Sequence, residues 1–163
     1  MVEQLSAATS LRDAIGTLRR ILQMQRLLAT RRLIRSPINV VCFTEWSPEQ
    51  IVIRRRFRQH LSRWDFEGYG LCIDRNWLQQ QGARPAIYGD QECWRRLSSR
   101  ERPFFQLAHS KSGVAWRVER EWRHLGDVDL RELSPRQAIV FVRFEAEISL
   151  VSLESRWPVV CAS

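Results

Sequence analysis

The stretch Asn39-Val-Val-Cys-Phe-Thr-Glu-Trp-Ser-Pro-Glu-Gln50 contains the sharpest change of secondary structure in the chain. Its first six residues are mostly apolar strand formers, which predicts a strand over 39–44. Ser47 is a good helix N-cap and Pro48 suits a first helical turn, so a helix is expected from residue 48 to about residue 63. A strand followed at once by a capped helix indicates a domain that contains both kinds of element.

The same reasoning extends in both directions along the chain. An amphipathic helix is expected over 5–30, because leucine and isoleucine recur there at helical spacing, and a basic connector should follow to residue 35. Further strands are expected over 69–73, 84–88, 116–123, 137–144, 148–153 and 158–161, and short helices over 75–81, 91–97 and 103–108. These elements predict one α+β domain over 1–163, with a core over 38–130 and C-terminal strands over 131–163.

Composition and charge narrow the class of protein. The 163 residues are 44% hydrophobic and 27% charged, with only 7 glycines and 6 prolines, which excludes collagen-like and disordered chains. The formal net charge is +8, and Lys111 is the only lysine among 26 basic residues. Arginine suits phosphate groups, which favours nucleic acid as a partner, although a GC-rich genome would also enrich arginine.

Targeting and redox signals point to a cytoplasmic protein. The N-terminal residues lack the basic and apolar regions of a signal peptide, and no apolar run approaches the length of a membrane span. The four cysteines form no Cys-x-x-Cys pair, so neither a structural zinc site nor any other metal is expected. Cys42 and Cys72 lie in apolar runs, where a buried, reduced thiol is expected.

Residues 116–123, Trp-Arg-Val-Glu-Arg-Glu-Trp-Arg, carry the most suggestive chemistry. On a strand, side chains alternate, so Glu119 and Glu121 would lie side by side between Arg117 and Arg123. Two carboxylates beside a ribose could stabilise an oxocarbenium-like transition state. The alternative is a solvated strand face with ordinary cross-strand ion pairs.

Two further places could contribute to a site. Thr44 and Glu45 end a strand just before a helix N-terminus, where free N–H groups can face a ligand; helix capping explains them equally well. Arg84 and Tyr88 would share a strand face, where they could clamp a phosphate and stack on a base, or hold the edge of the sheet.

A basic run is typical of a nucleic-acid footprint. Its arginines are Arg54, Arg55, Arg56, Arg58 and Arg63. The alternative is a solvated face of a helix.

Four short motifs resemble the prokaryotic abortive-infection proteins of the AbiGi antitoxin-like group. These motifs are Val-Cys-Phe-Thr-Glu45, the run from Tyr69 to Trp77, Gly-Ala-Arg-Pro-Ala-Ile-Tyr88, and the run from Trp116 to Asp127. The resemblance covers about 38–130. It implies a component of a phage-defence or toxin–antitoxin system, with a protein partner from the same operon.

A more distant resemblance is to ADP-ribosyltransferases, which implies a split sheet and NAD as cofactor. An early arginine (Arg35 or a neighbour), Thr44, and the Glu119-x-Glu121 pattern follow the order of that family. By this resemblance Glu121 would be the catalytic carboxylate, Glu119 would assist transfer, and the cofactor would contact Glu45, Arg84, Tyr88 and Arg123. The chain departs from the family in two respects: Thr44 stands alone and not in a Ser-Thr-Ser triplet, and no strand is expected around the early arginine.

Three functions follow from these patterns. The first is an NAD-dependent ADP-ribosyltransferase of phage defence that acts on nucleic acid or protein. The second is a non-enzymatic, basic subunit that binds nucleic acid or a protein partner. The third is a metal-dependent nuclease that uses some of Glu45, Asp74, Asp90, Glu119 and Glu121, although the lysine such a core normally needs is missing from their vicinity.

Overall fold

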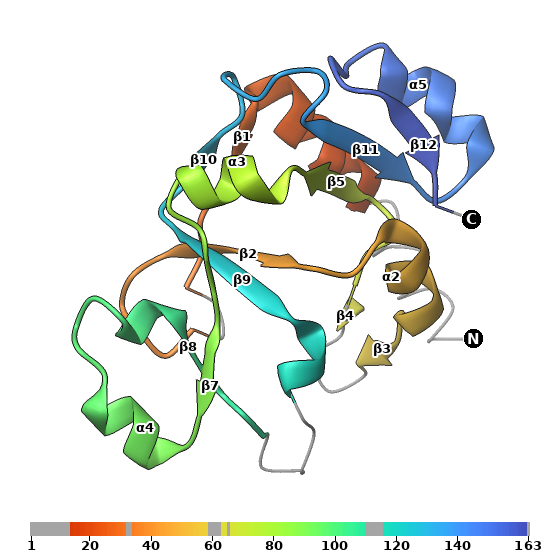
Figure 1. The fold of residues 1–163 in the computed structure, drawn as a ribbon. Helices are drawn as coiled ribbons and strands as arrows, with labels where there is room; N and C mark the ends of the chain where they lie inside the picture. Colours follow the sequence, from red (N-terminus) through yellow and green to blue (C-terminus); the bar gives the residue numbers. More distant parts are fainter. Residues whose placement is uncertain (1–13, 32–33, 59–62, 65, 110–115, 163) are drawn as a thin grey trace. The chain divides into compact units, whose positions relative to one another are not determined.

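The computed structural model describes residues 14–31, 34–58, 63–64, 66–109 and 116–162 (Figure 1). The chain is an α+β protein, as expected, with short helices and several small sheets. Its residues divide into two compact units. Unit 1 comprises Met1–Gln25, Ser47–Asp74 and Arg131–Ser163, and unit 2 comprises Arg26–Trp46 and Arg75–Leu130. Each unit is built from separate stretches of the chain. The expected single domain over 1–163 requires the two units to fold together, and this stays a prediction.

The centre of unit 1 is a three-stranded sheet in the order β12-β11-β5 (Figure 1). β11 (Ala138–Val142) pairs antiparallel with β5 (Gly70–Ile73) and parallel with β12 (Val159–Cys161), and Val140 and Val142 are fully buried. The expected strand over 148–153 is wrong: this segment is helix α5 (Ile148–Ser152), preceded by the 3-10 turn Glu145–Glu147. Parallel neighbours need a crossover connection, and α5 provides it.

The first helix is shorter than its apolar pattern predicts. In the described chain it covers residues 14–24, with Leu18 and Leu22 buried as the pattern requires. It ends because Gln25 has φ 51°, in the left-handed region, and its side chain donates to the Leu22 carbonyl at 2.6 Å. The next residues form β1 (Arg26–Leu27), which pairs with β10 (Val128–Asp129) in unit 2. Residues 5–13 of the expected helix lie outside the described residues.

The second helix begins as predicted and ends early. α2 (Pro48–Arg54) starts with a capping box, in which Ser47 Oγ accepts from the Gln50 backbone at 3.4 Å and the Gln50 side chain accepts from the Ser47 backbone at 3.0 Å. The expected continuation to residue 63 is wrong, because Arg55 is extended and β3 (Phe57–Arg58) pairs with β4 (Arg63–Trp64). The rings of Phe57 and Trp64 meet edge to face at 5.3 Å across this pair, which stabilises the hairpin.

Unit 2 contains a second three-stranded sheet in the order β2-β9-β6. β2 (Val40–Thr44) confirms the strand of the opening motif, and it pairs with β9 (Glu121–Leu125). β6 (Arg84–Pro85) is the outer strand, where a proline is tolerated because one side of the strand is unpaired. Helix α3 (Arg75–Gln80) precedes it and is followed by Gly82, whose φ of 98° favours glycine.

The rest of unit 2 is a strand–helix–strand unit. β7 (Ile87–Gly89) leads to α4 (Gln91–Arg96), which Asp90 caps by accepting from the Cys93 N–H at 2.8 Å. β8 (Phe105–Leu107) then runs parallel to β7. Two expectations are therefore corrected: 84–88 is two strands in different sheets, and 103–108 is a 3-10 turn, Arg102–Phe104, followed by a strand. Phe105 is buried in β8, with its ring 5.3 Å from that of Trp94 on α4, and this burial outweighs the helical spacing of its neighbours.

The expected strand over 116–123 begins five residues late. Trp116–Glu119 forms a 3-10 turn, and Arg120 has φ 46°. A residue in the left-handed region breaks the alternation of a strand, so Glu119 and Glu121 do not share a strand face.

Among the described residues, no helix has both the length and the apolar character needed to cross a membrane.

Candidate functional site

Arg123 is a buried arginine at the centre of a hydrogen-bond network in unit 2. It is 1% exposed, and each of its five N–H groups has an acceptor. Nε and Nη2 donate to the two Glu121 oxygens at 2.8 and 3.1 Å, Nη1 donates to the Pro103 and Phe105 carbonyls at 2.9 and 2.7 Å, and Nη2 also donates to Gln106 Oε1 at 2.6 Å. The expected role of Arg123 in holding a cofactor is corrected, because no N–H remains for a phosphate.

Glu121 is the partner that neutralises this buried guanidinium. Its side chain is 13% exposed, and its backbone N–H donates to the Tyr88 hydroxyl at 2.9 Å. Burial raises the pKa of Tyr88. The expectation of a buried residue at Cys42 is wrong, because Cys42 is exposed, yet local burial of its thiol and the Glu121 charge raise the pKa of this thiol to about 12. The structure thus brings Glu121, Arg123 and Tyr88 together, and the hydrogen bonds between them stabilise the fold.

Thr44 and Glu119 form a second internal contact. Thr44 Oγ1 donates to the Glu119 carbonyl at 2.6 Å and accepts from the Trp46 N–H at 3.3 Å. The hydroxyl therefore joins the end of β2 to the 3-10 turn before β9. This is the capping-type role that the sequence left open beside a catalytic one.

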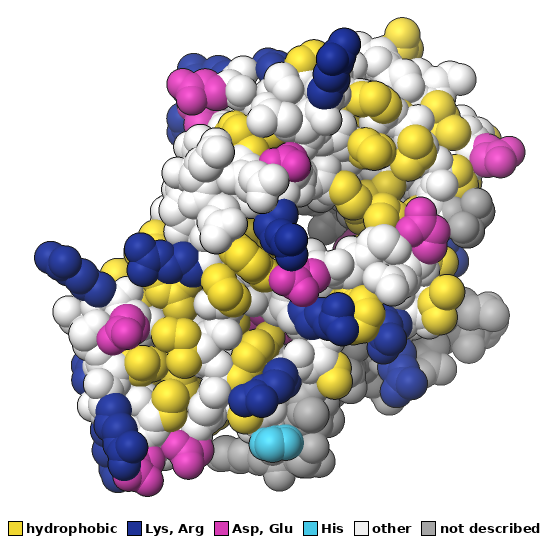
Figure 2. All heavy atoms as spheres, in the orientation of Figure 1, with side chains coloured by type: hydrophobic (Ala, Val, Ile, Leu, Met, Phe, Trp, Pro, Cys, Tyr) yellow, Lys and Arg dark blue, Asp and Glu magenta, His cyan; other side chains and the backbone are white. Residues whose placement is uncertain are grey.

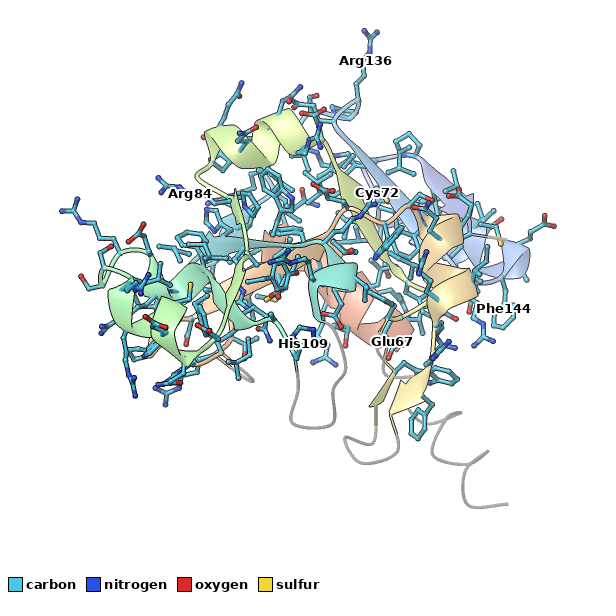
Figure 3. All side chains as sticks on the ribbon, turned by 60° about the horizontal axis from the view of Figure 1, so that its bottom comes forward. Glu67, Cys72, Arg84, His109, Arg136 and Phe144 are labelled. Carbon is cyan, nitrogen blue, oxygen red and sulfur yellow. The ribbon has the colours of Figure 1, made fainter. Side chains whose placement is uncertain are left out.

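Arg84 and Tyr88, expected on one strand face, are separated. Arg84 lies on β6 and is exposed, and Figure 3 shows its side chain extending away from the ribbon. Its guanidinium carbon is 5.8 Å from the centre of the Phe104 ring. Tyr88 lies on β7 in a different sheet, so the two side chains do not form a phosphate clamp on one strand.

Glu45 belongs to an aromatic cluster that the sequence reasoning missed. Its Oε1 accepts from the Trp122 indole N–H at 2.9 Å and lies 3.8 Å from Arg75 Nη1. The neighbouring Trp46 donates its indole N–H to the Val118 carbonyl at 2.9 Å. Arg120 stacks over the Trp46 ring, 4.7 Å from its centre. We call Trp46 and Trp122, with Arg75, Arg120 and Glu45, the indole cluster.

A signal for this cluster was present in the sequence. Trp46 follows Glu45 directly, and Trp122 alternates with the charged residues of 117–123. Their relation could be found only by pairing β2 with β9, which sets Phe43 opposite Trp122 and brings the Glu45 N–H to the Arg120 carbonyl at 3.3 Å.

The basic run lies in unit 1, and we call Arg54–Arg56 with β3 and β4 the arginine hairpin. Arg55 is the anchored member: its guanidinium lies 3.7 Å from the centre of the Trp64 ring, donates to the Phe66 carbonyl at 3.1 Å and to Glu67 at 3.2 Å, and is 7% exposed. Arg54 and Arg56, on either side of it, are exposed. The structure does not describe the side chains of Arg58 and Arg63.

The acids proposed for a nuclease do not come together as a metal site. Within the part of the chain that the structure describes, no three His, Cys, Asp or Glu side chains are grouped so as to hold a metal ion. Asp90 is a helix cap, and Glu121 is paired with Arg123.

The sequence and the fold were compared with known proteins. No protein-family model, curated protein or solved structure matches the chain.

Proposed function

We propose that this chain is a non-enzymatic nucleic-acid-binding protein whose arginine hairpin holds phosphate groups. The observation that carries the proposal is the arrangement of Arg54, Arg55 and Arg56. The central guanidinium is fixed between Trp64 and Glu67. Arg54 is the last residue of α2, Arg56 lies between α2 and β3, and both of these flanking residues are exposed. The helix ends at Arg55, so an anchored arginine lies between two exposed ones, and exposed arginines are the side chains that contact a phosphate backbone.

The net charge supports the same conclusion. A chain of formal charge +8 attracts a polyanion at long range, and arginine recognises phosphate with a fork of N–H donors. The residues chosen for NAD chemistry have other partners: the Arg123 donors bind protein acceptors, and the Thr44 hydroxyl binds the Glu119 carbonyl. A place in a phage-defence or toxin–antitoxin system, and NAD as a ligand, stay predictions of the resemblances.

The experiment is a titration of a fluorescent oligonucleotide with the full chain at several salt concentrations. Counterion release makes the logarithm of affinity fall with the logarithm of salt by about 0.9 per phosphate contact on duplex DNA. The double variant Arg54→Glu with Arg56→Glu should weaken binding and lower this slope by about 2. The outcome that removes the proposal is binding that responds neither to salt nor to these two changes.

The chain offers a matched control for the charge change. Arg95 and Arg96 are adjacent, exposed arginines on α4 in unit 2. Arg95→Glu with Arg96→Glu changes the net charge by the same amount. If this control lowers affinity and slope as much as the hairpin variant, only the net charge matters and the hairpin is not the site.

A further inference from the structure

We propose that Arg143, just beyond the end of β11, is a further phosphate-contacting residue of unit 1. This inference rests on the proposed function and extends its site, because nucleic acid bound at the arginine hairpin also reaches this guanidinium. Arg143 belongs to none of the candidate sites that the sequence suggested, since it lies far from Arg54–Arg56 along the chain. The fold is what brings it to the hairpin.

The Arg143 guanidinium is half-buried, yet it has no polar partner in the part of the chain that the structure describes. Its guanidinium carbon lies 5.1 Å from the centre of the Phe144 ring. No hydrogen bond or ion pair joins its side chain to another described residue. The five N–H donors of the group therefore stay available to a ligand, and phosphate oxygens accept from a guanidinium through two parallel bonds.

Arginines that serve the fold of this chain have a different environment. Arg123 donates to Glu121 and to further acceptors around it, and Arg55 donates to Glu67 and to a backbone carbonyl. Taking a guanidinium out of water is costly unless protein acceptors replace the water, and at both of these positions they do. Arg143 gives up part of its hydration without such acceptors, and a bound phosphate group would supply them.

Two acids of unit 1 could in principle neutralise Arg143, and both bind other groups. The Glu67 carboxylate pairs with Arg55 at 3.2 Å. The two oxygens of Glu147 accept from the Tyr69 hydroxyl at 3.0 Å and from a backbone N–H at 3.2 Å. Neither carboxylate takes the donors of Arg143, which leaves them for an anion from outside the chain.

The stem of Arg143 lies against the segment that anchors the arginine hairpin. Phe66 and Glu67 accept from Arg55, and Gly68 follows them directly. A Cβ on Gly68 would lie 3.2 Å from both Cβ and Cδ of Arg143, so only a glycine leaves the stem its place against the backbone here. Burial lowers the pKa of Arg55, and the charge of Arg143 lowers it further, as two neighbouring positive groups require.

The position of Arg143 is set by the sheet. Its carbonyl accepts from the Cys161 thiol at 3.4 Å, which ties the end of β11 to β12. In Figure 2, Lys and Arg side chains (dark blue) lie close together in the region where Figure 1 draws the end of α2 and β3. Several guanidinium groups on one unit can contact successive phosphates of a strand, and each contact adds to the salt dependence of binding.

The test measures how salt affects oligonucleotide binding by the full chain, with the fluorescent probe used for the arginine hairpin. Arg143→Gln should lower affinity about tenfold at low salt and lower the salt slope by about 0.9, the value of one phosphate contact on duplex DNA. Arg143→Lys keeps the charge and should keep the slope. Adding Arg143→Gln to the hairpin variant should lower the slope by about 0.9 more.

Arg136→Gln is the matched control. Arg136 is an exposed arginine of the same unit, it precedes β11 whereas Arg143 follows it, and Figure 3 shows its side chain extending away from the ribbon. The substitution removes the same charge and should leave affinity and slope nearly unchanged. If Arg143→Gln does not fold, Arg143→Met takes its place, because methionine keeps an aliphatic stem against Gly68.

The outcomes separate this inference from the proposed function. If the hairpin variant loses affinity and slope but the variant without the Arg143 charge binds like the unchanged chain, Arg143 is not a phosphate contact and the proposed function stands. If Arg136→Gln lowers the slope equally, only net charge matters and the inference is wrong. A loss of affinity at Arg143 with no fall in slope would show a structural role and would also overturn it.

Discussion

Glu121 and Arg123 lie two residues apart on β9, on the same face of the sheet, and the carboxylate holds the guanidinium through bonds of 2.8 and 3.1 Å. Arg123 is 1% exposed, so this is a buried ion pair. Arg123 also donates to the Pro103 and Phe105 carbonyls. The pair therefore links the sheet to the segment that contains these two residues and fixes how that segment packs in unit 2.

The first prediction concerns the stability of this pair. Glu121→Gln leaves a buried guanidinium without its counter-charge, which should lower the free energy of unfolding by about 3 kcal/mol. Arg123→Met should cost a similar amount. Urea unfolding of both single variants and the double variant measures the coupling, and the double variant should lose about 1–3 kcal/mol less than the sum of the two. Strict additivity would show that the two side chains act independently.

The same pair shows why part of the site could not be predicted. The sequence places Glu119, Glu121 and Arg123 at alternate positions, and alternation on an ideal strand gives them one face. A left-handed residue at Arg120 removes Glu119 from the strand, and burial of Arg123 depends on carbonyls about twenty residues away. Local patterns do not contain either piece of information.

The starts and ends of helices could be predicted, because they depend on the chemistry of a few neighbouring residues. Ser47 and Pro48 begin α2, Asp90 begins α4, and Gly82 follows α3 with positive φ. The errors fall where long-range pairing decides. The segment 148–153 has strand-forming residues, yet it must connect two parallel strands and becomes a helix. Arg55 belongs to an apparently continuous helix, yet its stacking on Trp64 favours a hairpin.

The second prediction concerns Gly70, where β5 passes over a buried ring. A Cβ at this position would lie 2.8 Å from the Phe141 ring, and Phe141 is 4% exposed. Gly70→Ala should therefore lower the free energy of unfolding by about 1–3 kcal/mol, and Phe141→Leu in the same chain should recover part of the loss.

Gly16 provides the control for that substitution. It lies in the helix over 14–24, and an added Cβ would meet nothing within 4 Å. Gly16→Ala should raise the free energy of unfolding by about 0.5–1 kcal/mol, since alanine is the better helix former. Denaturant midpoints that move in the same direction for both variants would contradict the account of Gly70.

The third prediction concerns alkaline pH. The chain has two tyrosines, and both have a raised pKa: Tyr69 through burial and its bond to Glu147, and Tyr88 through burial. A raised pKa in the folded state means that stability is complete below the unfolded value of about 10 and falls as pH rises above it. Tyrosinate absorbance should therefore appear together with the loss of circular dichroism. Tyrosine ionisation half-complete near pH 10 in a protein that is still folded would contradict this prediction.

The fourth prediction concerns the Cys42 thiol, which lies opposite Arg123 in the β2–β9 pair. Burial of the sulfur and the charge of Glu121 raise its pKa to about 12, from an ordinary value near 9. Only the thiolate is nucleophilic, so at pH 8 a much smaller fraction of Cys42 should be reactive than of an unperturbed cysteine, even though Cys42 is exposed. Labelling with iodoacetamide, read by peptide mass spectrometry, should rise steadily with pH and show no plateau between about pH 9 and pH 10.

Glu121→Gln removes the second cause of the raised pKa and should speed labelling of Cys42. Cys72 in unit 1 serves as the internal control, because burial also raises its pKa, to about 11, and no contribution comes from Glu121. Faster labelling at both cysteines would mean that the variant unfolds, whereas faster labelling at Cys42 alone would mean that the Glu121 carboxylate acts directly on this thiol.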